Sequence, residues 1–203
     1  MIRNHIKEWV GNLGKIELTE ERIEKIKSVC HLNEVDPNLI YIFPIMLCHN
    51  DIDVDYEAFT DNALEQLSDL YIGKHGFIDD FIFNNARIFD TKIVQPNKNL
   101  FFKYVLAEVA LFKNEHTEKV IEYIENTPFI EISIACSVKD RRCSICGKQI
   151  YECKHLKGSY YDTKLGEDEL CFAELNDVTD VYEWAFVKPY DNENKDGYLC
   201  NEI

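Results

Sequence analysis

The segment from Cys143 to His155 constrains the fold of this chain more than any other part of the sequence. It reads CSICGKQIYECKH, so three cysteines and one histidine are closely spaced. Two residues separate Cys143 from Cys146, which lets one tight turn aim both thiolates at a shared ion, and Gly147 supplies a permissive backbone for that turn. Cys153 and His155 follow after a short excursion. Together the four side chains form a Cys₃His set suited to tetrahedral zinc, and a closed four-ligand site of this kind is structural.

Two other interpretations of the cysteines are open at this point. In the first, Cys171 or Cys136 replaces His155 as the fourth ligand. In the second, the cysteines are reduced and buried and hold no metal. The chain has eight cysteines and no recognisable secretory signal, so we expect a reducing compartment. Clustered cysteines in such a compartment are more typical of metal ligands than of disulfides.

Charge and apolar content exclude several classes of function. The 203 residues are 46% hydrophobic, which is enough for one domain with a full-sized core. The formal net charge of −15 disfavours direct binding to nucleic acids and to anionic membrane surfaces. No apolar run reaches the roughly 20 residues that a membrane span needs. We therefore expect a protein that stays inside the cell that makes it, without nucleic-acid or membrane partners.

Hydrophobic periodicity predicts an α+β domain with many strands and few helices. Helices are predicted after the N-cap residues Thr19 and Thr60 and over residues 115–125. Strands are predicted over residues 39–48, 77–83, 86–94, 100–112, 129–138, 170–175 and 181–188. The lack of βαβ alternation favours a barrel-like architecture. The predicted divisions are an N-terminal helical segment (1–33), a main domain (39–190) with a zinc-knuckle insertion (139–158), and a polar tail (191–203).

Four stretches of the chain together carry a resemblance to a known family. They are Leu47–Leu70 (LCHNDIDVDYEAFTDNALEQLSDL), Tyr71–Arg87 (YIGKHGFIDDFIFNNAR), Phe129–Tyr161 (FIEISIACSVKDRRCSICGKQIYECKHLKGSYY) and Cys171–Pro189 (CFAELNDVTDVYEWAFVKP). The set resembles the prohead maturation proteases of tailed bacteriophages, which are herpesvirus-assemblin-like serine peptidases, and more narrowly a branch with a cysteine-rich insertion. The resemblance implies a closed or partly closed β-barrel with flanking helices and an inserted zinc knuckle.

The resemblance also implies roles for individual residues. Ser133 falls at the position of the family's nucleophile, and Glu183 falls at the position of an orienting carboxylate. Asp80 stands where the family has its catalytic histidine, whereas His75 and His49 lie nearby but do not match the motif. A serine hydroxyl needs a neighbouring imidazole to take its proton, and a carboxylate is a far weaker base. Catalysis is therefore in question.

Three hypotheses for function follow. In the first, the protein is a phage or prophage particle-assembly protein that has the protease fold, has lost catalysis and acts as a binding or structural module. In the second, it is an active maturation protease that uses Ser133, with His75 or His49 as base and Glu183 as orienting group. In the third, it is a zinc-knuckle adaptor unrelated to capsids. The resemblance implies capsid, scaffold or other particle proteins as partners, a homodimer by analogy, and a location in the host cytoplasm or the virion.

Overall fold

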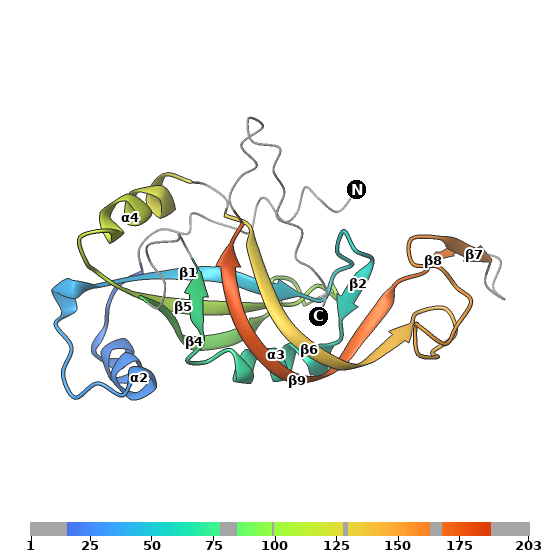
Figure 1. The fold of residues 1–203 in the computed structure, drawn as a ribbon, viewed down its shortest axis with the longest axis horizontal. Coiled ribbons are helices and arrows are strands. Elements are labelled where there is room, and N and C mark those ends of the chain that lie inside the picture. Colours follow the sequence, from blue (N-terminus) through green and yellow to red (C-terminus); the bar gives the residue numbers. More distant parts are fainter. Residues whose placement is uncertain (1–15, 78–84, 99, 128–129, 163–167, 188–203) are drawn as a thin grey trace.

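A curled sheet forms the body of the protein. The computed structural model describes residues 16–77, 85–98, 100–127, 130–162 and 168–187. Within these residues the fold is α+β, with a seven-stranded sheet that curls into a half-barrel and three α-helices around it (Figure 1). The predicted α+β class and partly closed barrel are confirmed at this level. No described helix has both the length and the apolar character that a membrane crossing requires.

The strands of the half-barrel lie between residues 40 and 186. They are β1 (Ile40–His49), β2 (Glu57–Phe59), β3 (His75–Phe77), β4 (Ala86–Val94), β5 (Tyr104–Phe112), β6 (Ile132–Cys143) and β9 (Ala173–Phe186). Their order is β1-β5-β4-β3-β9-β2, and β6 also pairs with β9. A separate hairpin consists of β7 (Tyr160–Asp162) and β8 (Asp168–Leu170). The two strands predicted over 170–175 and 181–188 are mostly one continuous strand, β9, and most of the strand predicted over 77–83 lies outside the described residues.

The antiparallel pair of β6 and β9 is the feature that positions the cysteine segment. It runs from the pair Ile132–Phe186 to the pair Cys143–Ala173, and its register shifts twice on the way. Such bulges bend a strand pair and increase its twist. Figure 1 shows the two strands crossing the half-barrel as a curved ribbon, with the cysteine segment and the β7–β8 hairpin at its far end.

The main hydrophobic core lies on the inner face of the curled sheet. Alternate residues of β1 and β5 point into it, as the period of two in a strand requires. Helices α3 (Asp61–Leu70) and α4 (Thr117–Asn126) add their apolar faces to the same core, and the hydroxyl of Thr60 caps α3 as predicted. Trp184 is fully buried there, and a Cβ added to Gly76 would lie 2.1 Å from its ring. Only glycine therefore fits where β3 passes Trp184.

The outer face of the sheet carries helix α2 (Glu20–Cys30), which begins after its predicted N-cap residue Thr19. Ile26 is fully buried in a second, smaller core beneath this helix. The guanidinium of Arg22 donates two hydrogen bonds, of 2.7 and 2.8 Å, to the Glu108 carboxylate on β5. The described part of the N-terminal segment thus packs on the sheet. A short 3₁₀ turn, η1 (Pro37–Leu39), leads from α2 into β1.

Candidate metal centre

Three thiols and one imidazole lie together at the end of the β6–β9 ribbon. The ligand atoms of Cys143, Cys146, Cys153 and His155 are all within 4.8 Å of one another. The Cys143 Sγ and His155 Nδ1 atoms are 3.5 Å apart. Zinc–sulfur and zinc–nitrogen bonds of about 2.3 and 2.0–2.1 Å in a tetrahedron would place these two atoms about 3.5 Å apart. The cluster could hold a metal ion, and its donors are compatible with zinc.

The first half of the site is a tight turn that follows β6. Cys143 is the last residue of β6 and pairs with Ala173 of β9, so the sheet itself fixes its position. The Cys143 N–H donates to the Lys148 carbonyl, and the Gly147 N–H donates to the Cys143 carbonyl, both at 2.8 Å. Gly147 has a φ of +69°, which lies in the left-handed region that favours glycine. The turn therefore brings Cys146 back beside Cys143.

The second half of the site is a loop that follows the turn and is hydrogen-bonded to β6. The Ile150 N–H donates to the Arg141 carbonyl at 2.8 Å, and the Cys153 thiol lies 3.5 Å from the Ile150 carbonyl oxygen. The His155 ring packs edge-on against Tyr161 of β7, with 4.5 Å between the ring centroids. Tyr161 was not predicted to lie here, because an aromatic residue in a strand carries no signal of such a contact in the sequence.

Cys171 borders the cluster and stays an alternative fourth ligand. It is fully buried, and its Sγ is 3.8 Å from that of Cys143. Two thiolates on one tetrahedral zinc ion would be separated by about 3.8 Å as well. Backbone hydrogen bonds to Gly158 and Ser159 hold Cys171 in place. Cys136, the other alternative, lies in the middle of β6 and packs against the main core instead.

The protonation of the thiols distinguishes Cys143 from Cys171. Burial alone would raise the pKa of Cys143, but hydrogen bonds from the backbone N–H groups of Cys146 and Ile145 outweigh it and lower that pKa to about 6. Burial raises the pKa of Cys171 to about 11. The thiolate is the form that binds metal, so the lowered pKa suits Cys143 to that role, and its Sγ shares a hydrogen bond with the Sγ of Cys171.

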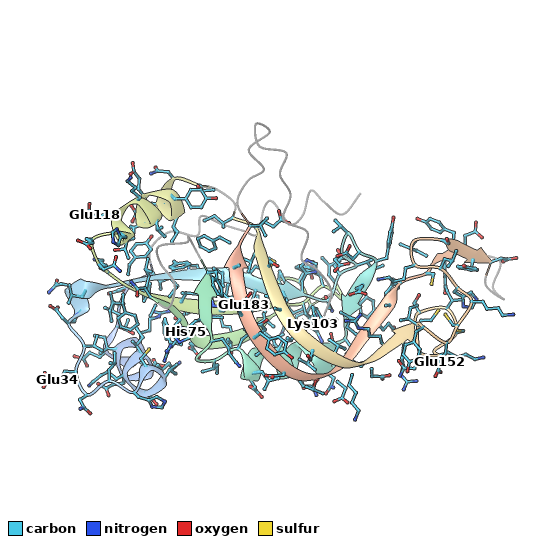
Figure 2. The ribbon with its side chains drawn as sticks, in the orientation of Figure 1. Glu34, His75, Lys103, Glu118, Glu152 and Glu183 are labelled. Carbon is cyan, nitrogen blue, oxygen red and sulfur yellow. The ribbon has the colours of Figure 1, made fainter. Side chains whose placement is uncertain are left out.

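The residues that the resemblance assigns to catalysis lie on neighbouring strands of the sheet. Ser133 of β6 pairs with Ala185 of β9, and Gly76 of β3 pairs with Trp184. Ser133, Glu183 and His75 therefore share the face of the sheet opposite the buried Trp184 side chain, and Figure 2 labels Glu183 and His75 on adjoining strands. Ser133 and Glu183 are both exposed.

The two histidines considered as the base for Ser133 each contact another group. Because β9 lies between β3 and β6, His75 and Ser133 lie two strands apart, with about 10 Å between their backbones. The His75 Nε2 accepts a hydrogen bond from Arg87 on β4, on the side of β3 away from Ser133. His49 ends β1, where its Nδ1 accepts from the Asp51 N–H at 3.2 Å. Asp80 lies outside the described residues.

Comparisons with models of protein families, with curated proteins and with solved structures find no match to this chain. The kinship with prohead proteases and the function that it implies therefore stay predictions, carried by the sequence stretches quoted for them.

Proposed function

We propose that the protein is a binding module with a structural zinc centre, which contacts other proteins and does not cleave them. The observation that carries this proposal is the set of four donors, Cys143, Cys146, Cys153 and His155, whose ligand atoms lie within 4.8 Å of one another. Thiolates with an imidazole favour zinc among the common divalent metals. Four side-chain ligands would complete a tetrahedral zinc site and leave no position for a reacting water, so the metal would act structurally.

The zinc ion would stabilise a lobe that has little hydrophobic core of its own. This lobe comprises the described residues of 143–171, and three of its large side chains are well exposed: Tyr151, Leu156 and Tyr160 are 76%, 68% and 67% exposed. Its hairpin consists of two strands of three residues each, and a two-stranded hairpin is at best marginally stable in water. A metal that joins the end of β6 to the loop carrying Cys153 and His155 would supply the missing stability.

Binding is favoured over catalysis by the surroundings of Ser133. The base that the second hypothesis needs is His75 or His49. The His75 Nε2 accepts a hydrogen bond from Arg87 on β4, and β9 lies between His75 and Ser133. The exposed side chains Tyr151, Leu156 and Tyr160 of the zinc lobe are available for contact with a partner. Following the resemblance, we propose capsid or scaffold proteins of a phage particle as those partners.

Metal analysis tests the proposal. Protein purified without added zinc should carry one equivalent by mass spectrometry, and its ligand cysteines should resist alkylation in the native state. Cys30, which lies in α2 away from the cluster, supplies a control: Cys30→Ser should leave the zinc content unchanged. Much less than one equivalent, with Cys143 and Cys146 freely alkylated, would refute the metal centre.

A second experiment tests binding against cleavage. The protein should bind the capsid or scaffold proteins encoded next to it and leave them intact. Processing of those proteins that disappears in Ser133→Ala would refute the non-catalytic proposal, provided that the variant is folded.

A further inference from the structure

Positive charge is concentrated in the segment that forms the candidate metal centre. Residues 139–157 contain six of the chain's 22 lysines and arginines but two of its 37 acidic residues. The six are Lys139, Arg141, Arg142, Lys148, Lys154 and Lys157. This segment therefore has a net charge of +4, whereas the rest of the chain carries −19. Charge is thus divided unevenly along the chain.

The basic segment lies at one end of the molecule. Figure 1 shows the end of β6 and the loop after it on the opposite side from α2 and α4. At physiological ionic strength, exposed charges more than about 8 Å apart are largely screened from each other. A ligand at this end therefore responds to the local positive charge more than to the −15 of the whole chain.

Half of the six basic side chains already have an acidic partner. The pairs are Arg142–Asp140 at 2.8 Å, Lys157–Glu57 at 2.7 Å and Lys139–Asp177 at 3.9 Å. The other three, Arg141, Lys148 and Lys154, are exposed, and none of them has an ion-pair partner among the residues that the structure describes. An anion could bind these three without breaking any of the pairs.

The contact of β6 with the turn after it separates the paired cation from two of the unpaired ones. Arg142 forms a β-bridge with Gln149. Both side chains donate to the Asp140 carboxylate, at 2.8 and 2.6 Å, so this face of the bridge is already occupied. Arg141 and Lys148 each precede a bridged residue, so their side chains lie on the other face.

The unpaired cations adjoin the metal centre. Cys143 follows Arg142 in β6, so its side chain lies on the same face as that of Arg141. Lys154 stands between two of the ligands in the chain. A zinc ion bound by three thiolates and a neutral imidazole has one net negative charge, which one of these cations can balance. The remaining cations are then in excess of what the metal centre needs.

An exposed aromatic side chain lies beside these cations. Tyr151 is 76% exposed, and the hydrogen bond from the Ile150 N–H to the Arg141 carbonyl brings its backbone next to Arg141. Its ring offers an apolar surface, and its hydroxyl can form a hydrogen bond with a polar group. We refer to Arg141, Lys148, Tyr151 and Lys154 together as the basic surface.

We propose that the basic surface binds an acidic segment of a partner protein, with carboxylates against the three cations and an apolar side chain against Tyr151. This inference rests on the proposed zinc centre, which would hold in place the turn and loop that carry Lys148 and Lys154. Carboxylates suit the surface because an arginine guanidinium binds a carboxylate through two parallel hydrogen bonds. Each exposed ion pair contributes little, so the complex should be weak and sensitive to salt.

A short acidic peptide fits this surface better than a nucleic acid does. Duplex DNA carries one negative charge per about 1.7 Å of its axis, so it would extend past the few cations of the basic surface. Beyond them it would meet the rest of the chain, whose net charge is −19. A peptide segment can confine its carboxylates to the basic surface and avoid that repulsion.

Fluorescence anisotropy with a labelled peptide of glutamate and leucine residues tests the proposal. The wild-type protein should bind this peptide, and raising the salt from 50 to 500 mM should weaken binding about tenfold. Lys148→Glu should raise the Kd about fivefold, because it replaces an attraction with a repulsion. Lys119→Glu changes the net charge equally at an exposed position of α4, at the opposite end of the molecule, and should leave the Kd unchanged.

A second charge reversal and the zinc content separate this proposal from the metal centre. Arg141→Glu should weaken peptide binding as Lys148→Glu does, and both variants should still carry one equivalent of zinc. A wild-type protein with one equivalent of zinc that does not bind the peptide at millimolar concentration would overturn the proposal and leave the metal centre intact. Peptide binding that both reversals leave unchanged would overturn it as well. A poly-dT oligonucleotide that binds more tightly than a peptide of equal charge would assign the surface to nucleic acids instead.

Discussion

Replacing Cys146 with serine tests the metal centre at the ligand that contributes least to packing. Cys146 is the one exposed member of the four-donor cluster, so a change in stability reports metal binding rather than a cavity. Structural zinc contributes about 10–16 kcal/mol in small zinc-finger peptides, and an equal share for one of four ligands is roughly 3 kcal/mol. Cys146→Ser should therefore destabilise the zinc lobe by about that amount.

Hydrogen exchange locates this loss within the fold. Because about 1.4 kcal/mol corresponds to a factor of ten, amide exchange in residues 143–171 should become roughly a hundredfold faster in Cys146→Ser. Amides of the main core around Trp184 should keep their protection, since that core does not depend on the metal. A chelator should give the same pattern in the wild-type protein. Unchanged exchange in the lobe after either treatment would refute the reasoning.

Cys171→Ser is the matched variant that identifies the fourth ligand. If His155 binds the metal, Cys171→Ser should retain one equivalent of zinc and lose only about 1 kcal/mol, because a buried thiol is replaced by a more polar hydroxyl. His155→Ala should then lose the metal. Retention of zinc by His155→Ala together with its loss from Cys171→Ser would reverse the assignment.

Three further outcomes are expected. Arg22→Ala should lower the free energy of unfolding by about 2–4 kcal/mol in urea, because it leaves the largely buried Glu108 carboxylate without its partner; a loss below about 0.5 kcal/mol would contradict this. Burial raises the pKa of Tyr41 to about 12, so the native state keeps a proton that the unfolded chain loses near pH 10. The free energy of unfolding should therefore fall as the pH rises from about 10 to 12, and Tyr41→Phe should flatten this decline. A fluorophosphonate should not label Ser133, and labelling that Ser133→Ala abolishes would favour the peptidase hypothesis.

Features with local causes could be predicted from the sequence. Thr19 and Thr60 cap their helices because a hydroxyl reaches backbone N–H groups a few residues further along the chain. Successive apolar residues of β1 enter the two different cores in turn, because neighbouring side chains of a strand point to opposite faces. Cys143, Cys146, Cys153 and His155 converge as predicted, because one tight turn and one short excursion are enough to bring them together.

Contacts between distant parts of the chain were decided by the tertiary structure alone. The proximity of Cys171 to Cys143 depends on the register between β6 and β9, and the separation of Ser133 from His75 depends on β9 lying between their strands. Spacing along the chain determines only which residues a short turn or a helix can bring together. The order and register of the strands depend on burying the apolar surface of all the strands at once, so no single segment of the sequence specifies them.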